Sequence, residues 1–113
     1  MSSDIFERLY KGDTVSADDG QMDLLREASY ATKKLVLKMN RSSDPAEIRN
    51  LLSRITDTEI HESTAVFTPL LINYGKHTKI GKNVFINFDC IFLDLGGITI
   101  ENNVQIAPRV SLL

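Results

Sequence analysis

Large apolar residues recur at a regular spacing in the second half of the chain, from Ile60 to Leu112. The steps between them are 6, 6, 8, 6, 6, 8, 6 and 6 residues, and the nine positions are Ile60, Val66, Ile72, Ile80, Ile86, Phe92, Ile100, Ile106 and Leu112. This spacing matches neither the two-residue period of a flat strand nor the 3.6-residue period of a helix. The pattern also repeats as a whole every 20 residues, and an internal repeat of this length indicates a solenoid.

A triangular coil explains the repeat. Three sides of six residues, with two extra residues at one corner, give 20, and each side is expected to be a short strand lying parallel to its equivalent about 4.8 Å away in the next coil. A second, smaller inward position falls four residues after a repeated apolar residue, and it is filled by Val84, Cys90, Val104 and Val110. The "IG", "KN" and "NN" pairs around Gly81, Asn83 and Asn103 suit tight corners, because Gly and Asn tolerate positive φ.

The first 57 residues show helical rather than coil periodicity. A short helix is expected after Asp4, which acts as N-cap with Glu7, and Gly12 ends it. Asp18 or Asp19 is expected to cap a longer helix, whose apolar stripe is Leu24, Ala28, Ala31, Leu35 and Met39. Its other face carries the cations Arg26, Lys33, Lys34 and Lys38, which we interpret as a solvated face.

A third helix is predicted after the cap residue Asp44, with Pro45 in its first turn. Its buried stripe is expected to be Ile48, Leu51, Leu52 and Ile55. The chain is therefore divided into a helical domain, residues 1–57, and a coil domain, residues 58–113.

Composition narrows the class of protein. The chain has 113 residues, 42% hydrophobic and 25% charged, as in a globular domain, and its formal net charge of −2 gives no case for nucleic acid or an anionic membrane. No apolar run approaches the roughly 20 residues of a membrane span. Charges in the N-terminal segment and a single cysteine, Cys90, favour a cytoplasmic protein.

The stretch "NYGKHTKIGKNVFINFDCIFLDLGGITIENNVQIAPRV" resembles the first coils of the maltose and galactoside O-acetyltransferases, which are hexapeptide-repeat acyltransferases. The resemblance implies a mixed fold, with a helical subdomain followed by an incomplete left-handed parallel β-helix. It implies acetyl transfer from acetyl-CoA to a sugar hydroxyl, with a histidine as general base and no metal. It also implies a homotrimer with the active site between subunits.

Several residues match acceptor-side positions of that family. Asn87 matches the asparagine that hydrogen-bonds the sugar, Phe85 an aromatic position of the acceptor site, and Asn73 another polar position. Asp94 lies in the acidic stretch that orients the sugar or the histidine. Asp18 or Asp19 corresponds to an acid that the helical domain contributes to the pocket. Taken alone, Asn87 could be a corner residue, Asp94 could simply shape its corner, and Phe85 could be a packing residue.

Three other residues have simpler interpretations. His61 and His77 do not lie in the family's histidine motif, and two histidines are too few for the three-histidine zinc sites of some β-helix enzymes. Cys90 falls on an inward position, so it is interpreted as a small buried filler rather than a nucleophile.

The catalytic histidine of the family follows the "IAPRV" motif by several residues, so its equivalent is expected after Leu113. Solenoids need capped ends, and "APRVSLL" stops in the middle of a side. We therefore expect a truncated family member with little activity as a 113-residue chain. Alternatives are a non-catalytic sugar-binding or assembly partner with the same coils, and an acetyltransferase for another hydroxyl or an amine.

Overall fold

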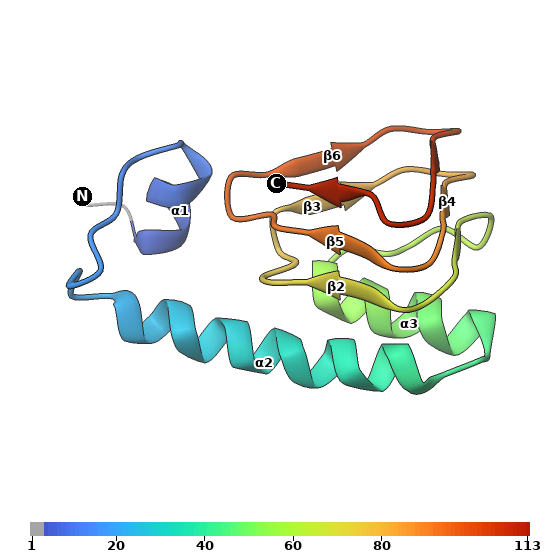
Figure 1. Cartoon of the computed structure of the whole chain (residues 1–113), viewed down its shortest axis with the longest axis horizontal. Coiled ribbons are helices and arrows are strands. Elements are labelled where there is room, and N and C mark those ends of the chain that lie inside the picture. Colours follow the sequence, from blue (N-terminus) through green and yellow to red (C-terminus); the bar gives the residue numbers. More distant parts are fainter. Residues whose placement is uncertain (1–3) are drawn as a thin grey trace.

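The computed structural model describes residues 4–113 and places three helices before eight short strands (Figure 1). The helices are α1 (Ile5–Tyr10), α2 (Met22–Arg41) and α3 (Pro45–Thr56). The strands are β1 (Ala65–Val66), β2 (Leu70–Ile72), β3 (Thr78–Ile80), β4 (Phe85–Ile86), β5 (Cys90–Phe92), β6 (Ile98–Ile100), β7 (Gln105–Ile106) and β8 (Ser111–Leu112).

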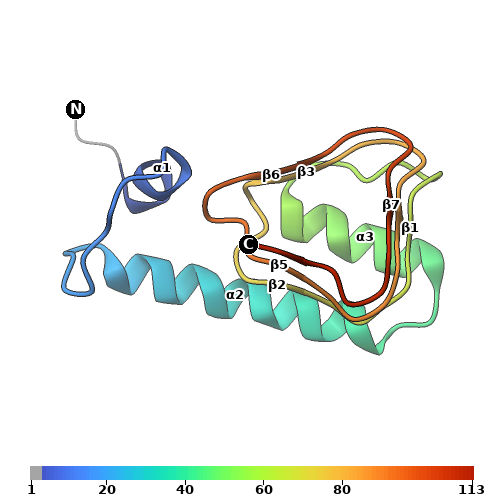
Figure 2. The same ribbon diagram turned by 45° about the horizontal axis from the view of Figure 1, so that its top comes forward.

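The strands form three parallel sheets, in the orders β1-β4-β7, β2-β5-β8 and β3-β6. Every pair is in a register of 20 residues, as in Val66 opposite Ile86 and Ile86 opposite Ile106. Figure 2 shows the strands of each sheet overlaid, so that the chain traces a roughly three-sided outline. The 20-residue repeat and the parallel stacking predicted from the sequence are confirmed.

The repeated apolar residues form the core inside the coils. Seven of the nine are buried, and Ile80 and Leu112 are partly buried against them. At the second inward position Val84 and Cys90 are buried, and Val104 and Val110 are partly buried. Inward residues come from all three sides, so a single apolar core joins them.

The corners use positive φ as expected at Asn83 (54°) and Asn103 (66°). The prediction for Gly81 was wrong, because its φ is not in the left-handed region. Gly81 is small for a different reason: a Cβ there would collide with the side chain of Asn102 in the next coil. Its conformation is ordinary, and it is the close approach of two coils that requires glycine.

Two of the three helices begin as predicted. The Asp4 side chain accepts a hydrogen bond from the Glu7 N–H (2.8 Å), and the Asp44 side chain accepts one from the Ala46 N–H (3.2 Å). The α3 stripe is also confirmed, with all four of the expected residues buried.

The expectations for α2 were partly wrong. Its N-cap is Gln21, which makes no side-chain cap bond, and Asp18 and Asp19 lie in the preceding loop. Its buried stripe is Thr32, Val36 and Met39, whereas Leu24 and Ala31 are exposed. The apolar residues of α2 cover more than one face, so position in the fold decides which of them are buried.

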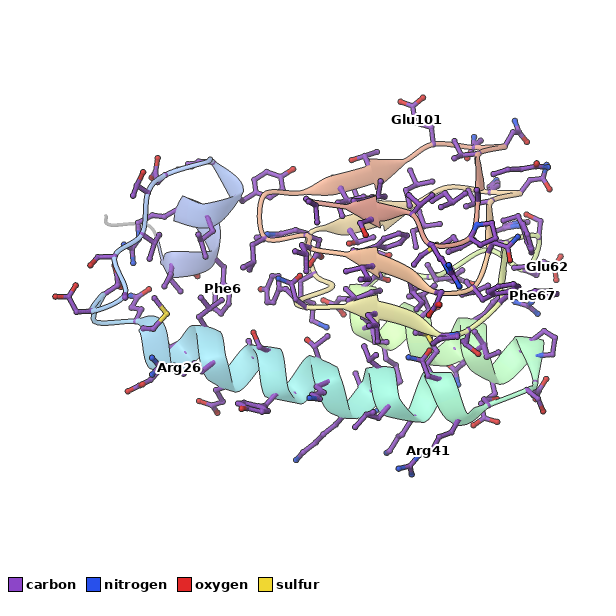
Figure 3. All side chains as sticks on the ribbon, viewed as in Figure 1. Phe6, Arg26, Arg41, Glu62, Phe67 and Glu101 are labelled. Atoms are coloured by element: carbon purple, nitrogen blue, oxygen red, sulfur yellow. The ribbon has the colours of Figure 1, made fainter. Side chains whose placement is uncertain are left out.

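The helices cover the first coil, with α2 against β2 and α3 against β1 (Figure 1). The Asn40 amide, on α2, donates from Nδ2 to the Leu70 carbonyl (3.0 Å) and accepts at Oδ1 from the Leu70 N–H (3.0 Å). This pair of bonds replaces, at one residue, the ladder that a preceding strand would make. On the other side of α2, Arg26 and Arg41 point away from the strands (Figure 3), and Lys33, Lys34 and Lys38 are exposed, as expected for a solvated face.

Candidate functional site

Asn87 and Phe85 lie on the outer face of the sheet β1-β4-β7. Ile86 between them is buried, and side chains alternate along a strand, so its two neighbours point outward. The Asn87 Oδ1 accepts a hydrogen bond from the Phe88 N–H (2.9 Å), and its Nδ2 makes no hydrogen bond to any group in residues 4–113. This amide can therefore donate to a ligand oxygen.

Phe67 belongs to the same face and was missed in the sequence. The Val66–Ile86 register places it beside Asn87, and its N–H donates to the Ile86 carbonyl (2.9 Å). Its ring meets that of Phe85 edge to face, with centroids 5.3 Å apart, and 57% of its surface is exposed. Figure 3 shows Phe67 at the end of the coils opposite α1. Applying the 20-residue repeat to Asn87 would have identified it.

We call Phe67, Phe85 and Asn87 the acceptor face. It combines two aromatic rings with an amide donor, a combination suited to a ligand with an apolar side and hydroxyl groups. Phe88, which follows Asn87, is also exposed, at 48%.

Asp94 occupies a different place, in the interior. It is 0% exposed, and its carboxylate accepts hydrogen bonds from the N–H groups of Tyr74, Gly75 and His77 (3.2, 3.0 and 3.2 Å) and from the Thr78 hydroxyl (2.8 Å). The bonds hold the loop that joins β2 to β3. In this chain the carboxylate is turned toward that loop and away from solvent.

Asn73 is the partner of Asp94 in the adjacent coil. Its Oδ1 accepts a hydrogen bond from the Asp94 N–H (3.0 Å). Asn73 also lines an apolar groove of about 380 Å³ between α2 and the sheet β2-β5-β8. The structure therefore groups Asn73 with Asp94, apart from Asn87 and Phe85.

Asp19 is engaged with the first helix. Its carboxylate accepts two hydrogen bonds from the Arg8 guanidinium (2.6 and 3.1 Å) and one from the Gln21 N–H (2.9 Å). The hydrogen bonds from Arg8 and then from Gln21 lower the pKa of Asp19 from 3.8 to about 2. Asp18 is exposed and bonds to the Ser16 hydroxyl.

Asp18 and Asp19 lie beside α1, whereas the acceptor face lies on the opposite side of the coils (Figure 2). A single chain does not bring these aspartates to Asn87. Any pocket that combines them requires more than one subunit.

Neither histidine lies at the acceptor face. His61 is exposed, and its Nδ1 accepts from the Ser63 N–H (3.1 Å) and contacts the Ser63 hydroxyl (2.7 Å) in a local turn. His77 Nδ1 bonds to the Leu95 carbonyl (3.0 Å), on the side of the coils near α1. Cys90 is buried, and its thiol contacts the carbonyls of Asn87 and Ala107 (3.2 and 3.3 Å), as expected for an inward filler.

Two searches of the structure found nothing within residues 4–113. No three His, Cys, Asp or Glu side chains in that range gather as a metal site. Over the same residues, no helix has the length and apolar character to span a membrane.

Comparisons with known proteins give a consistent group of relatives, although no family model matches the chain. Galactoside O-acetyltransferase of Escherichia coli is 33% identical over 90 residues, covering 78% of this chain and 44% of the relative. A maltose O-acetyltransferase from Clostridium difficile has a crystal structure that superposes with a TM-score of 0.82 at 29% identity, covering 94% of this chain and 56% of the other.

A crystal structure of a hexapeptide-repeat acetyltransferase from Vibrio cholerae, complexed with acetyl-coenzyme A, matches with a TM-score of 0.71 at 25% identity, covering 96% of this chain and 57% of that chain. The chain spans about half the length of the curated relatives it matches. The homologues of this chain are acetyltransferases, and its structural neighbours are of the hexapeptide-repeat type.

Proposed function

We propose that this homologue of the hexapeptide-repeat acetyltransferases forms the acceptor-binding part of an acetyl-CoA-dependent O-acetyltransferase that acts on a sugar hydroxyl. Its strands are then the first coils of a left-handed parallel β-helix, and residues 1–57 are its helical domain. The most direct support within the chain is the acceptor face, where an Asn87 amide with an unused N–H lies beside Phe67 and Phe85. Further support is the 0.82 TM-score to a maltose O-acetyltransferase.

The residues of this chain divide the work as follows. Asn87 Nδ2 donates to a sugar oxygen, and the two phenylalanine rings pack against the apolar side of the sugar ring. In the transfer, the sugar hydroxyl oxygen bonds to the acetyl carbon, the thioester C–S bond breaks, and a base takes the hydroxyl proton. His61 and His77 do not reach the acceptor face, so the base is a group other than these two.

Assembly as a homotrimer in the cytoplasm completes this proposal. A subunit interface at the acceptor face would bring the Asp18–Asp19 loop of a second chain toward Asn87. Asp94 and Asn73 then support the site indirectly, by holding the loop between β2 and β3.

A binding experiment tests the proposal with the 113-residue chain. Amide NMR titration with maltose and with methyl β-galactoside is expected to move the Phe67 and Asn87 signals, and Asn87→Ala is expected to abolish the response. Asn50→Ala, an exposed change on α3, serves as the control. If neither sugar binds, or if Asn87→Ala binds as well as the parent, the acceptor assignment is wrong.

A second candidate function is sugar binding without catalysis. The observation that favours it is the absence of a histidine contact at the acceptor face among the described residues. An acetyl-CoA assay separates the two: loss of a general base lowers rates by about 10²–10⁴-fold. Efficient transfer by residues 1–113 would rule out the non-catalytic alternative.

A further inference from the structure

A pocket of about 340 Å³ lies between α1 and the sheet β3-β6, away from the acceptor face. Three ammonium groups, one carboxylate and two ring side chains line it, from Lys11, Lys76, Lys79, Glu7, Tyr10 and His77. We call it the lysine pocket. α1 lies on the opposite side of the coils from β1 and β7 (Figure 2), so the pocket is separate from Phe67 and Asn87.

The charge of the lysine pocket is opposite to that of the protein. Three lysines face one glutamate in the pocket, whereas the whole chain carries a formal net charge of −2. A concave surface lined by one sign of charge concentrates its field and favours ions of the other sign. An anion is therefore the ligand that the pocket selects.

The lysines are positioned by the backbone and by fixed bonds. Thr78 is buried, so Lys79, the next residue of β3, points outward, and its register partner on β6 is Thr99, whose exposed side chain also lines the pocket. The Lys76 ammonium donates to the carbonyls of Arg54 and Ile55 (both 3.0 Å), in the last turn of α3. An ammonium has three donors, so one remains for a ligand.

The aromatic wall of the pocket is also held in place. The rings of Tyr10 and His77 meet edge to face with centroids 4.7 Å apart, and His77 makes the same kind of contact with Tyr74 at 4.9 Å. The Tyr10 ring packs over Gly97, where a Cβ would come within 2.9 Å of the tyrosine Cε2. Tyr10 keeps 50% of its surface exposed, so part of its ring is available to a ligand.

From this arrangement we propose that the lysine pocket binds a small molecule that carries a phosphate group next to a flat or ring-shaped part. The phosphate is held by the ammonium groups of Lys76 and Lys79, with the Thr99 hydroxyl as a further donor. The ring part lies against Tyr10. A volume of about 340 Å³ suits a single small molecule rather than a polymer.

The test uses amide NMR of the 113-residue chain, titrated with inorganic phosphate and with phenyl phosphate at constant ionic strength. Both are expected to give saturable shifts at His77, Lys79 and Thr99, with phenyl phosphate binding more tightly because of Tyr10. Lys79→Glu is expected to weaken phosphate binding at least tenfold. Lys38→Glu, the same charge change on the exposed face of α2, is expected to leave it unchanged.

Three results would overturn the proposal: linear shifts that do not saturate, equal weakening by the two charge reversals, or shifts confined to residues outside the lysine pocket. Maltose added to the same sample should move Asn87 and leave Lys79 unchanged. The outcome at Asn87 tests the acceptor face, and the outcome at Lys79 tests the lysine pocket, so either can fail alone.

Discussion

Asp94 and Asn73 hold neighbouring coils together through a reciprocal arrangement. The Asp94 N–H donates to Asn73 Oδ1 (3.0 Å), and the Asp94 carboxylate accepts from the N–H groups of the two residues after Asn73 (3.2 and 3.0 Å). The side chain of each residue therefore satisfies the backbone of the other's coil. A loop of eight-residue spacing, where no strand pairing is possible, is ordered by these bonds.

Asp94→Ala is expected to destabilise the fold strongly. It leaves three N–H groups and a hydroxyl in or near the interior without their acceptor, and each unsatisfied buried donor costs about 1–3 kcal/mol. We expect a loss of at least about 3 kcal/mol in the free energy of unfolding, measured with urea. Asp89→Ala is the control, because Asp89 is exposed and its ion pair with Arg109 is long (3.9 Å). Equal losses in the two variants would contradict a structural role for Asp94.

Asn40→Ala is expected to lower the free energy of unfolding by about 2 kcal/mol. The change removes both bonds to Leu70 and leaves a backbone N–H and a backbone carbonyl of the first coil unpaired under α2. Hydrogen exchange at the Leu70 amide should accelerate with it. The matched change Asn50→Ala, on the exposed side of α3, should alter neither quantity.

Gly75→Ala is expected to be far more damaging than Gly96→Ala. Gly75 has φ of 93°, and a Cβ there would lie 2.5 Å from the Ile55 carbonyl oxygen, whereas a Cβ at Gly96 meets nothing within 4 Å. We expect a loss of more than about 2 kcal/mol at Gly75 and a change within about 0.5 kcal/mol at Gly96. Thermal or urea unfolding of the two variants checks this; similar stabilities would mean that the loop relaxes away from α3.

The Arg8–Asp19 ion pair is expected to make the attachment of α1 sensitive to acid. The pKa of Asp19 is lowered from 3.8 to about 2, so the pair stabilises the folded chain above pH 3.8, and this contribution is lost as the pH falls toward 2. Carboxyl NMR titration should show the low pKa directly, and Arg8→Ala should return it toward 3.8. Asp18, which does not contact Arg8, serves as an internal reference in the same spectrum. An unchanged Asp19 titration in Arg8→Ala would show that the pair does not form in solution.

Phe67→Ala is expected to weaken sugar binding about three- to tenfold, consistent with the 0.5–1.5 kcal/mol typical of aromatic contacts. NMR titration with maltose measures the effect. Phe67→Leu keeps an apolar side chain without the flat ring, so it should bind more weakly than the parent if ring packing is what matters. Unchanged binding in both variants would remove Phe67 from the acceptor face.

The sequence was most informative where its periods are long and regular. The nine repeated apolar residues specified the coil, its 20-residue register and its core, because a six-residue return can be satisfied by few backbones. The buried stripe of α3 was also correct, since its apolar residues occupy only one face.

Predictions failed where the outcome depends on tertiary contacts. Leu24 and Ala31 fit a helical stripe as well as Thr32 and Val36 do, and only the position of β2 beneath α2 selects the second pair. Asp19 has the composition of an N-cap, yet Arg8 competes successfully for its carboxylate. The buried network of Asp94 is equally invisible in the sequence, because its donors are backbone groups of the preceding coil.

The constant register has a consequence for how this chain can change its length. All five strand pairings join residues 20 apart. Duplicating a 20-residue segment would add one complete layer, about 4.8 Å thick, with every inward residue still inward. Inserting a single residue within a side would instead reverse the orientation of the side chains that follow it. Growth or shortening of this architecture is thus confined to whole-layer steps, and any added residues outside such a step must loop out at a corner.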